Sequence, residues 1–186
     1  MIRKFYNHYL SSEKQIARSV ASIVGCTPSN LQIFKQAFSH KSASDPKLHT
    51  VTSNERLEYL GDSILSTIVA EYLFQKYPNS NEGFLTKMRS KIVKRKTLNR
   101  IADDMGIDVI LQENNDTRLS ESMKGNALEA LVGAIYLEKG FDKTKDIVVK
   151  KILRRHLNIQ ELEDNDDNYK SQLLEFCQKN GNDIDY

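Results

Sequence analysis

The stretch NERLEYLGDSIL, residues 54–65, places three acids inside an otherwise apolar segment. On a helix with 3.6 residues per turn, Glu55, Glu58 and Asp62 share one stripe, because their spacing is i, i+3 and i+7. The leucines and isoleucines fall on another face, and Gly61 lies within that apolar arc. A glycine inside a helix costs about 1 kcal/mol relative to alanine, so Gly61 suggests that another helix approaches closely here.

A second segment, GNALEALVGAIYL (residues 125–137), repeats this arrangement, with Asn126, Glu129 and Gly133 on one stripe. If the two stripes face each other, they bring together four hard oxygen donors, a set that suits Mg²⁺ or Mn²⁺. Those donors are Glu58, Asp62, Asn126 and Glu129. The alternative is that each stripe is only the solvated face of an amphipathic helix, as a single acidic stripe usually is.

The rest of the chain predicts an all-α fold, because apolar residues recur at helical spacing and no segment shows the alternation of a strand. Expected helices cover 13–24, 27–40, 53–77, 81–106, 120–139 and 142–157. Ser53 is the expected N-cap of the third, and Gly25 and Gly140 are expected to end two others. Polar residues predict loops at 42–52 and 114–118.

The charge is unevenly distributed along the chain. Residues 161–186 hold eight acids and two lysines, so within a total of +2 the residues before 161 carry a net charge of +8. A basic body suggests a polyanionic partner, although solvated surface charge accounts for the same numbers. We interpret 1–160 as the folded body and 161–168 as an acidic linker, followed by a helical pattern in 169–186.

Several classes of protein are disfavoured. Cys26 and Cys177 have no spacing typical of a zinc site or a disulfide framework, which fits a reducing cytoplasm. We see no signal peptide, and no stretch is apolar enough to span a bilayer. No histidine lies three residues after a glutamate, as it does in di-iron helical bundles.

These segments resemble the ribonuclease III family. NERLEYLGDSIL is similar to its signature stretch, and NALEALVGAIYLEKG (126–140) to its second acidic motif. AFSHKS (37–42) and EGFLTKMRSKIVKRKTL (82–98) resemble its early helix end and its middle basic helix. The resemblance covers about 15–157 and implies an all-α endonuclease domain, working as a cytoplasmic homodimer on double-stranded RNA.

By position, the resemblance implies that Asp62 and Glu129 are catalytic and that both bind Mg²⁺, or Mn²⁺ in its place, together with Glu58 and Asn126. It implies hydrolysis to 5′-phosphate and 3′-hydroxyl ends, roles in RNA processing that include ribosomal RNA precursors, and no small-molecule cofactor or membrane. Tyr59 matches an aromatic residue that docks into the partner subunit, and an ordinary core tyrosine is the alternative. Accessory or RNA-contacting positions are Glu55, Glu82, Lys87, Arg89 and Lys94.

The chain departs from the family pattern at Asn126, where the family usually has aspartate. An amide oxygen can bind Mg²⁺ but brings no charge, so we expect a higher metal requirement. The alternative is a non-catalytic relative that binds double-stranded RNA or the ribosome, and a purely structural helical bundle is a third possibility. Residues 169–186 resemble only the first helix of a double-stranded RNA-binding domain, so we expect a truncated sequence rather than the alternative, a vestigial tail.

Overall fold

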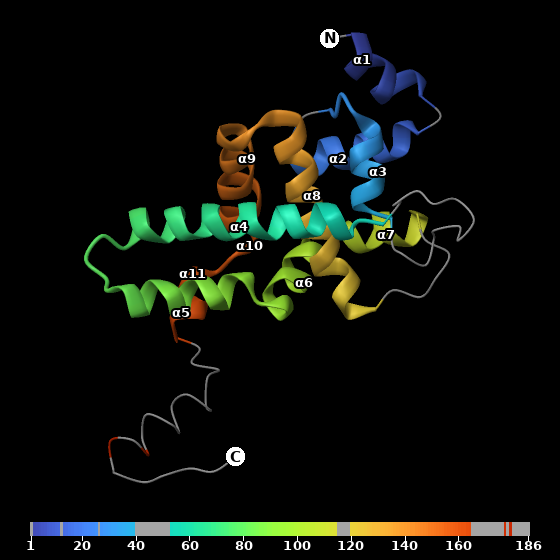
Figure 1. Ribbon diagram of the computed structural model, residues 1–186. Coiled ribbons are helices and arrows are strands. Elements are labelled where there is room, and N and C mark those ends of the chain that lie inside the picture. The colour runs from blue at the N-terminus through green and yellow to red at the C-terminus, as the bar shows by residue number, and fades with distance from the viewer. Residues whose placement is uncertain are drawn as a thin grey trace.

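The structure is a computed structural model that describes residues 2–11, 13–25, 27–39, 53–114 and 120–164, together with positions 177 and 179. Within these ranges the regular elements are helices and no strand occurs, which confirms the all-α prediction (Figure 1). The loop expected at 42–52, residues 40–42 of AFSHKS, the second half of the acidic linker and nearly all of 169–186 lie outside the described residues.

Two long helices, α4 (Glu55–Lys76) and α8 (Glu121–Lys139), pack against each other at the centre of the molecule. Figure 1 shows α8 crossing the first half of α4. From α4, Leu65, Ile68 and Leu73 are buried, and from α8 the same holds for Leu128 and Leu131. The apolar arcs of the two acid-bearing segments therefore form the middle of the core.

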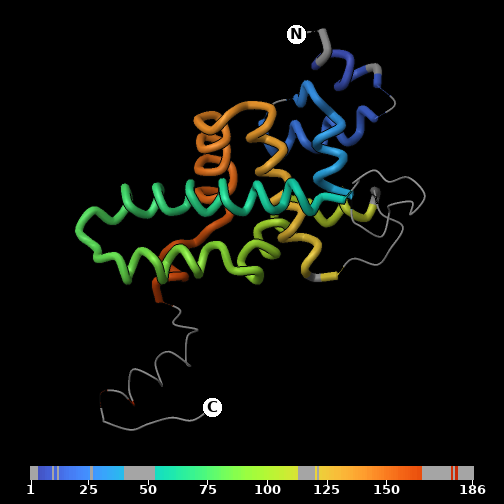
Figure 2. The backbone as a smooth tube through the Cα atoms, in the orientation of Figure 1, coloured from blue at the N-terminus to red at the C-terminus, as the bar shows by residue number. Residues whose placement is uncertain are grey.

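Helix α5 (Glu82–Val93) runs back along α4 to form a long hairpin, as the tube in Figure 2 shows. The predicted single helix over 81–106 is wrong: the backbone is extended at Lys94 (φ −66°, ψ 145°), and α6 (Arg95–Asp104) starts after it. The Thr97 hydroxyl donates to the carbonyl of Lys91 (2.7 Å) across this break. The break lets α6 turn and bury Leu98 and Ile101 in the core.

Further helices surround this centre, and several were not predicted. The unpredicted ones are α1 (Ile2–Phe5), the π-helical stretch Tyr6–Leu10, and α7 (Ile107–Asn114). The predicted ones are α2 (Lys14–Val24), α3 (Leu31–Ala37), and the run of α9 (Phe141–Ile147), the π-helical Val148–Leu153 and α10 (Arg154–His156).

The predicted C-terminal glycines of two helices are confirmed, whereas the predicted N-cap of α4 is wrong. Gly25 and Gly140 end α2 and α8 with positive φ angles of 82° and 76°, as predicted. At the start of α4 the capping position is occupied by Asn54 and not by Ser53.

The predicted acidic linker begins too early. Residues 159–164 form helix α11 (Ile159–Asp164), which packs against α5. The Lys91 ammonium donates to the carbonyl of Leu162 (2.6 Å), and the Tyr77 hydroxyl donates to Glu163. The acids at 161–164 are thus part of a helix held against the hairpin.

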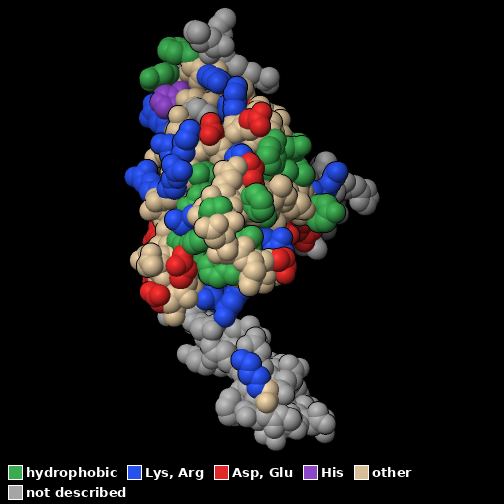
Figure 3. Space-filling model, turned by 90° about the vertical axis from the view of Figure 1, so that its left-hand side faces the viewer, with side chains coloured by type: hydrophobic (Ala, Val, Ile, Leu, Met, Phe, Trp, Pro, Cys, Tyr) green, Lys and Arg blue, Asp and Glu red, His purple; other side chains and the backbone are tan. Residues whose placement is uncertain are grey.

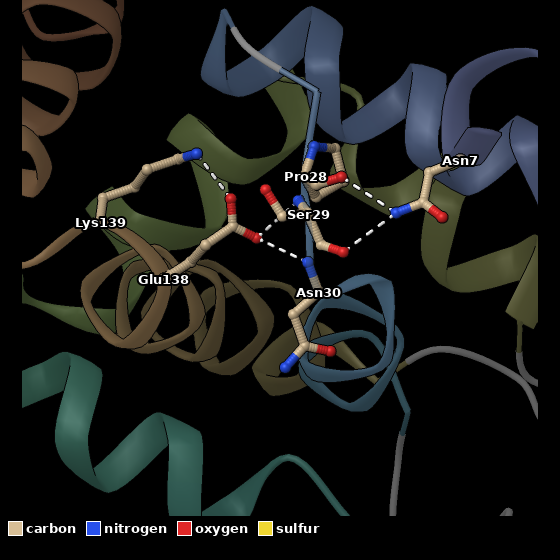
Figure 4. Close-up of polar contacts among 6 residues, drawn as sticks. All are labelled: Asn7, Pro28, Ser29, Asn30, Glu138 and Lys139. Atoms are coloured by element: carbon tan, nitrogen blue, oxygen red, sulfur yellow. Dashed lines mark hydrogen bonds and ion pairs between the residues drawn. The ribbon is translucent and has the colours of Figure 1, made fainter. Parts of the chain in front are cut away.

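One carboxylate of α8, Glu138, bonds the segment that joins α2 to α3, in addition to the packing of α3 on α8 (Figure 4). Its Oε2 accepts the backbone N–H groups of Ser29 (2.9 Å) and Asn30 (3.0 Å), and its Oε1 pairs with Lys139 (2.6 Å). From the other side, the Asn7 amide donates to the carbonyls of Pro28 and Ser29 (3.1 and 3.2 Å). The segment between α2 and α3 is therefore fixed on both sides.

The surface seen along the hairpin is chemically mixed. Figure 3 shows Lys and Arg side chains along one edge of this face, with hydrophobic side chains exposed nearer its centre. Among the helices that the structure describes, none combines the length and apolar character needed to cross a membrane.

Candidate functional site

The two glycines of the acidic stripes lie where α4 and α8 touch. A Cβ atom on Gly61 would stand 1.7 Å from the carbonyl oxygen of Glu129, and one on Gly133 would stand 2.4 Å from that of Leu57. Real Cβ atoms are essentially never closer than 3.0 Å to a non-bonded heavy atom of another part of the chain. The predicted close approach is confirmed, and it sets the backbone of Glu129 against the helix that carries Glu58 and Asp62.

The electrostatics of Glu129 show that acids from both helices meet. Burial is the largest effect on this carboxyl, and the charges of Asp62 and Glu58 act in the same direction. Together they raise the pKa of Glu129 to about 7, against the opposing effect of Arg95. Three carboxylates from two helices therefore lie close enough to repel one another.

Glu58 lies between neighbours of both signs. Burial raises its pKa most, the Arg95 charge lowers it, and Glu55 and Asp62 raise it further. A side-chain hydrogen bond from Asn126 favours the ionised form, and the net direction is upward. The position that departs from the family pattern is thus in contact with a predicted metal ligand.

Arg95 lies at the acidic cluster, where the sequence did not place it: in the sequence it is one cation of a basic run with possible phosphate contacts. Its Nη1 donates to Oδ1 of Asn126 (2.8 Å), and its charge acts on both Glu58 and Glu129. On a continuous helix Arg95 would be one more surface cation. The break at Lys94 makes it the first residue of α6 and brings it to the acids. The sequence shows three consecutive cations at 94–96, and such a cluster does not by itself predict that a helix ends there.

A small pocket of about 100 Å³ opens at this cluster. It is lined by Val93, Arg95, Leu98, Gly125, Asn126 and Glu129. A larger groove of about 500 Å³ lies beside it and is mainly basic. It is lined by Arg95, Lys96, Asn99, Arg100, Asp103 and Lys124. Arg95 lines both, so the small pocket and the basic groove adjoin at this residue.

The donors present fit a hard divalent cation in their chemistry: three carboxylates and one amide oxygen, partly buried and mutually repelling. Their present side-chain positions do not yet surround a common point. Within the described residues, no group of three His, Cys, Asp or Glu side chains is placed to hold a metal ion. The cation now among these acids is Arg95.

Of the two accessory acids, Glu55 lies at the acidic cluster and Glu82 does not. Glu55 opens α4 and its charge acts on Glu58, so it belongs to the cluster. Glu82 opens α5 beyond the hairpin turn, at the other end of α4, where its carboxylate accepts from the Thr86 hydroxyl (2.7 Å). Within one chain, Glu82 is therefore not part of the site. Tyr59 is 79% exposed, so it is not a core residue of this chain.

The proposed RNA-contacting cations also lie apart from one another. Lys87 and Arg89 are exposed on α5, whereas Lys94 is partly buried at the break before α6. The groove cations Lys96 and Arg100 are nearer to the acidic cluster, because both lie on α6.

Known proteins are similar to this chain in sequence and in fold. Residues 30–156 match the model of a ribonuclease-III-like family. The curated "Ribonuclease 3" of Azobacteroides pseudotrichonymphae is 41% identical over 92% of this chain and 66% of its own length. That of Bacteroides thetaiotaomicron is 39% identical over 88% and 53%, and that of Zunongwangia profunda is 36% identical over 100% and 77%. The chain thus spans between about half and three quarters of these relatives.

Solved structures agree. The nuclease domain of ribonuclease III from Campylobacter jejuni matches with a TM-score of 0.64 and 32% identity, over 76% of this chain and 96% of that domain. A Dicer from Giardia matches with a TM-score of 0.61 at 21% identity over 84% of this chain and 21% of its own, a likeness of fold alone. From the family match and these relatives, the chain belongs to the ribonuclease III family.

Proposed function

We propose that this chain is a metal-dependent endoribonuclease that hydrolyses phosphodiester bonds of double-stranded RNA. The observation that carries the proposal is the backbone contact at Gly61 and Gly133, which brings Glu58 and Asp62 of α4 to Glu129 of α8. The basic groove beside these acids supports an anionic substrate. The relatives' name, Ribonuclease 3, supports the same reaction.

Glu58, Asp62 and Glu129, with the amide oxygen of Asn126, are the residues that would hold Mg²⁺ or Mn²⁺. A divalent ion there would activate water and neutralise charge on the phosphate. Asp62 of α4 and Glu129 of α8 are the catalytic acids of this proposal: they would hold the ion, and the ion would supply the activated water. Because burial raises the pKa of Glu129, a nearby cation is needed to keep its carboxylate ionised at neutral pH.

The groove cations suit an RNA backbone. A-form RNA is recognised mostly through its shape, 2′-hydroxyls and phosphates, so we expect little base specificity. Lys96 and Arg100 in the groove, with Lys87, Arg89 and Lys94 as further candidates, would contact phosphates. Binding by these residues should weaken strongly as salt concentration rises.

The finer parts of the proposal are a homodimer and defined products. One related structure is described as having a region involved in dimer formation, and the exposed ring of Tyr59 on α4 offers such a contact here. Two acid clusters in a dimer would cut both strands and leave 5′-phosphate and 3′-hydroxyl ends. Precursors of ribosomal RNA are the natural substrates that we propose.

The experiment is cleavage of an end-labelled RNA duplex by the purified chain with and without Mg²⁺. We expect Asp62→Asn and Glu129→Gln to lower the cleavage rate by about two orders of magnitude or more while leaving the fold intact. Asp142→Asn, an exposed acid on α9, is the matched control and should cut at the wild-type rate. Wild-type rates in both site variants would show that these acids are not the catalytic ones.

A second candidate function is RNA binding without cleavage, favoured by the uncharged amide of Asn126. It predicts duplex binding but no cut across Mg²⁺ and Mn²⁺ titrations. Under this alternative Asn126→Asp would create activity where none existed, whereas under the first it would only change the amount of metal required.

A further inference from the structure

We propose that Arg95 is an internal counter-ion that holds the place of the divalent cation, so that the arginine and the metal ion compete for the acids of α4 and α8. This inference rests on the proposed function, because it assigns a regulatory role to a residue of the same site. It starts from the position of Arg95, whose guanidinium donates to the amide oxygen of Asn126 and which lines the same pocket as Glu129.

The first step is the electrostatic effect of Arg95. Its guanidinium already bonds the amide oxygen of Asn126, one of the proposed ligands, and Arg95 lines the same pocket as Asn126 and Glu129. A divalent cation held by the proposed ligands would bring a second positive charge to this pocket. Both cannot act fully at once, because two positive charges in a pocket of about 100 Å³ repel each other.

The second step is the weakness of the arginine's attachment. Arg95 donates to the neutral amide oxygen of Asn126 (2.8 Å) and, at the limit of a hydrogen bond, to the carbonyl of Ser122 (3.5 Å). No ion pair within 4.0 Å joins it to an acid in the described parts of the chain. Asn126 carries no charge, so its bond to Arg95 lacks the ion-pair attraction that a carboxylate would add, and the arginine can be released.

The third step is a destination for the released guanidinium. Arg95 already lines the basic groove beside Lys96 and Arg100, where the side chain would face solvent or a phosphate oxygen. Arginine suits phosphate because its planar fork can donate two hydrogen bonds at once. Entry of the ion and binding of the RNA backbone would therefore favour the same position of Arg95.

The test is Mn²⁺ binding by the full chain, measured by titration calorimetry, with melting temperatures measured in EDTA. Arg95→Gln removes the charge, and Lys96→Gln removes a neighbouring charge that does not line the acidic pocket. We expect Arg95→Gln to bind Mn²⁺ about tenfold more tightly than Lys96→Gln. Without metal, Arg95→Gln should melt about 2–4 °C lower than that control. Arg95→Lys, which keeps the charge, should bring both values back toward wild type.

Each outcome decides the inference. Tighter binding by Arg95→Gln supports it, including the case in which wild type binds too weakly to measure. If wild type, Arg95→Gln and Lys96→Gln bind Mn²⁺ equally, or if Arg95→Gln binds more weakly, the inference is wrong and the metal-dependent function stands. If none of them binds a divalent ion, the inference and the metal requirement of the proposed function both fail.

Discussion

Asn126 serves two neighbours of opposite charge with one side chain. Its oxygen accepts from Arg95, and its hydrogen bond to Glu58 favours the ionised carboxylate. An aspartate could accept from Arg95 but has no N–H to donate and would repel Glu58. The amide is therefore compatible with the acids in the absence of metal, at the cost of one negative charge when an ion binds.

Asn126→Asp should lower the Mg²⁺ concentration needed for half-maximal cleavage by several-fold, because ligand charge sets the affinity of hard cations. A Mg²⁺ titration of the cleavage rate measures this. Asn99→Asp is the control: Asn99 accepts from the backbone N–H of Gly125 (2.9 Å), so the variant adds a nearby charge outside the four proposed ligands. An equal shift in both variants would mean that Asn126 is not a ligand.

The raised pKa of Glu129 makes the free energy of unfolding depend on pH, in a direction that follows from the shift. A carboxyl whose pKa rises from 4.5 to about 7 on folding contributes most below pH 4.5, and this contribution is lost as the pH rises through 7. In EDTA, Glu129→Gln should therefore be more stable than wild type at pH 8, by on the order of 2 kcal/mol for this partly exposed group. Thermal melts at pH 5 to 8 measure the difference, which should shrink toward pH 5. A gap that widens on acidification would contradict the assignment.

At this scale the sequence pointed to the acids as the candidate site but did not place Arg95 beside them. Glu58, Asp62 and Glu129 are recognisable because carboxylates recur at helical spacing within apolar segments. Arg95 is one cation among many in 87–100. Its place beside the acids depends on the turn of the chain at Lys94, which no local pattern predicts.

The contact between α4 and α8 is the element on which the site depends. Gly61 and Gly133 let the two backbones meet, and this contact determines which turn of α8 faces Asp62. The glycines in the two segments predicted this packing. A glycine destabilises a helix interior, so its presence there suggests that a neighbouring backbone occupies the space of the missing side chain. The division of 81–106 into α5 and α6 was not predicted, since the extended residue is a lysine rather than a glycine or proline.

Gly61→Ala should destabilise the protein strongly, because the added methyl group would overlap the carbonyl of Glu129 at 1.7 Å. Overpacking a core costs about 1–3 kcal/mol, and a clash with backbone belongs at or above the upper end. Urea unfolding measures it. Gly83→Ala is the control, since its nearest new contact is the Asn81 side chain at 3.6 Å, and it should be neutral or slightly stabilising. Equal stability of the two variants would mean that the helices do not meet at Gly61.

On the scale of the molecule, the acidic centre is held within a shell of helices that the sequence predicted only in part. The helices that were missed are α1, the π-helical Tyr6–Leu10, α7 and α11, because they are too short to show a clear helical period in the sequence. Glu138 is the main polar connection between that N-terminal shell and α8. Although burial raises its pKa, the bonds from Lys139, Asn30 and Ser29 lower it overall.

Glu138→Gln should lower the free energy of unfolding by on the order of 2 kcal/mol at pH 7, because charged hydrogen bonds to two backbone N–H groups and Lys139 are weakened. Urea unfolding with Glu161→Gln, an exposed acid on α11, as control measures the loss. The wild-type advantage should also fall on acidification below pH 4.5, where Glu138 becomes protonated in the unfolded chain. No difference between the two variants at pH 7 would leave the N-terminal helices without this anchor.

The most direct test of the central claim is a crystal of the chain soaked with Mn²⁺ and measured for anomalous scattering. The account predicts a peak between α4 and α8, at roughly 2.0–2.2 Å from carboxylate oxygens of Asp62 and Glu129, with Arg95 turned toward the basic groove. A well-diffracting crystal with Mn²⁺ bound elsewhere and no peak at these acids would contradict it.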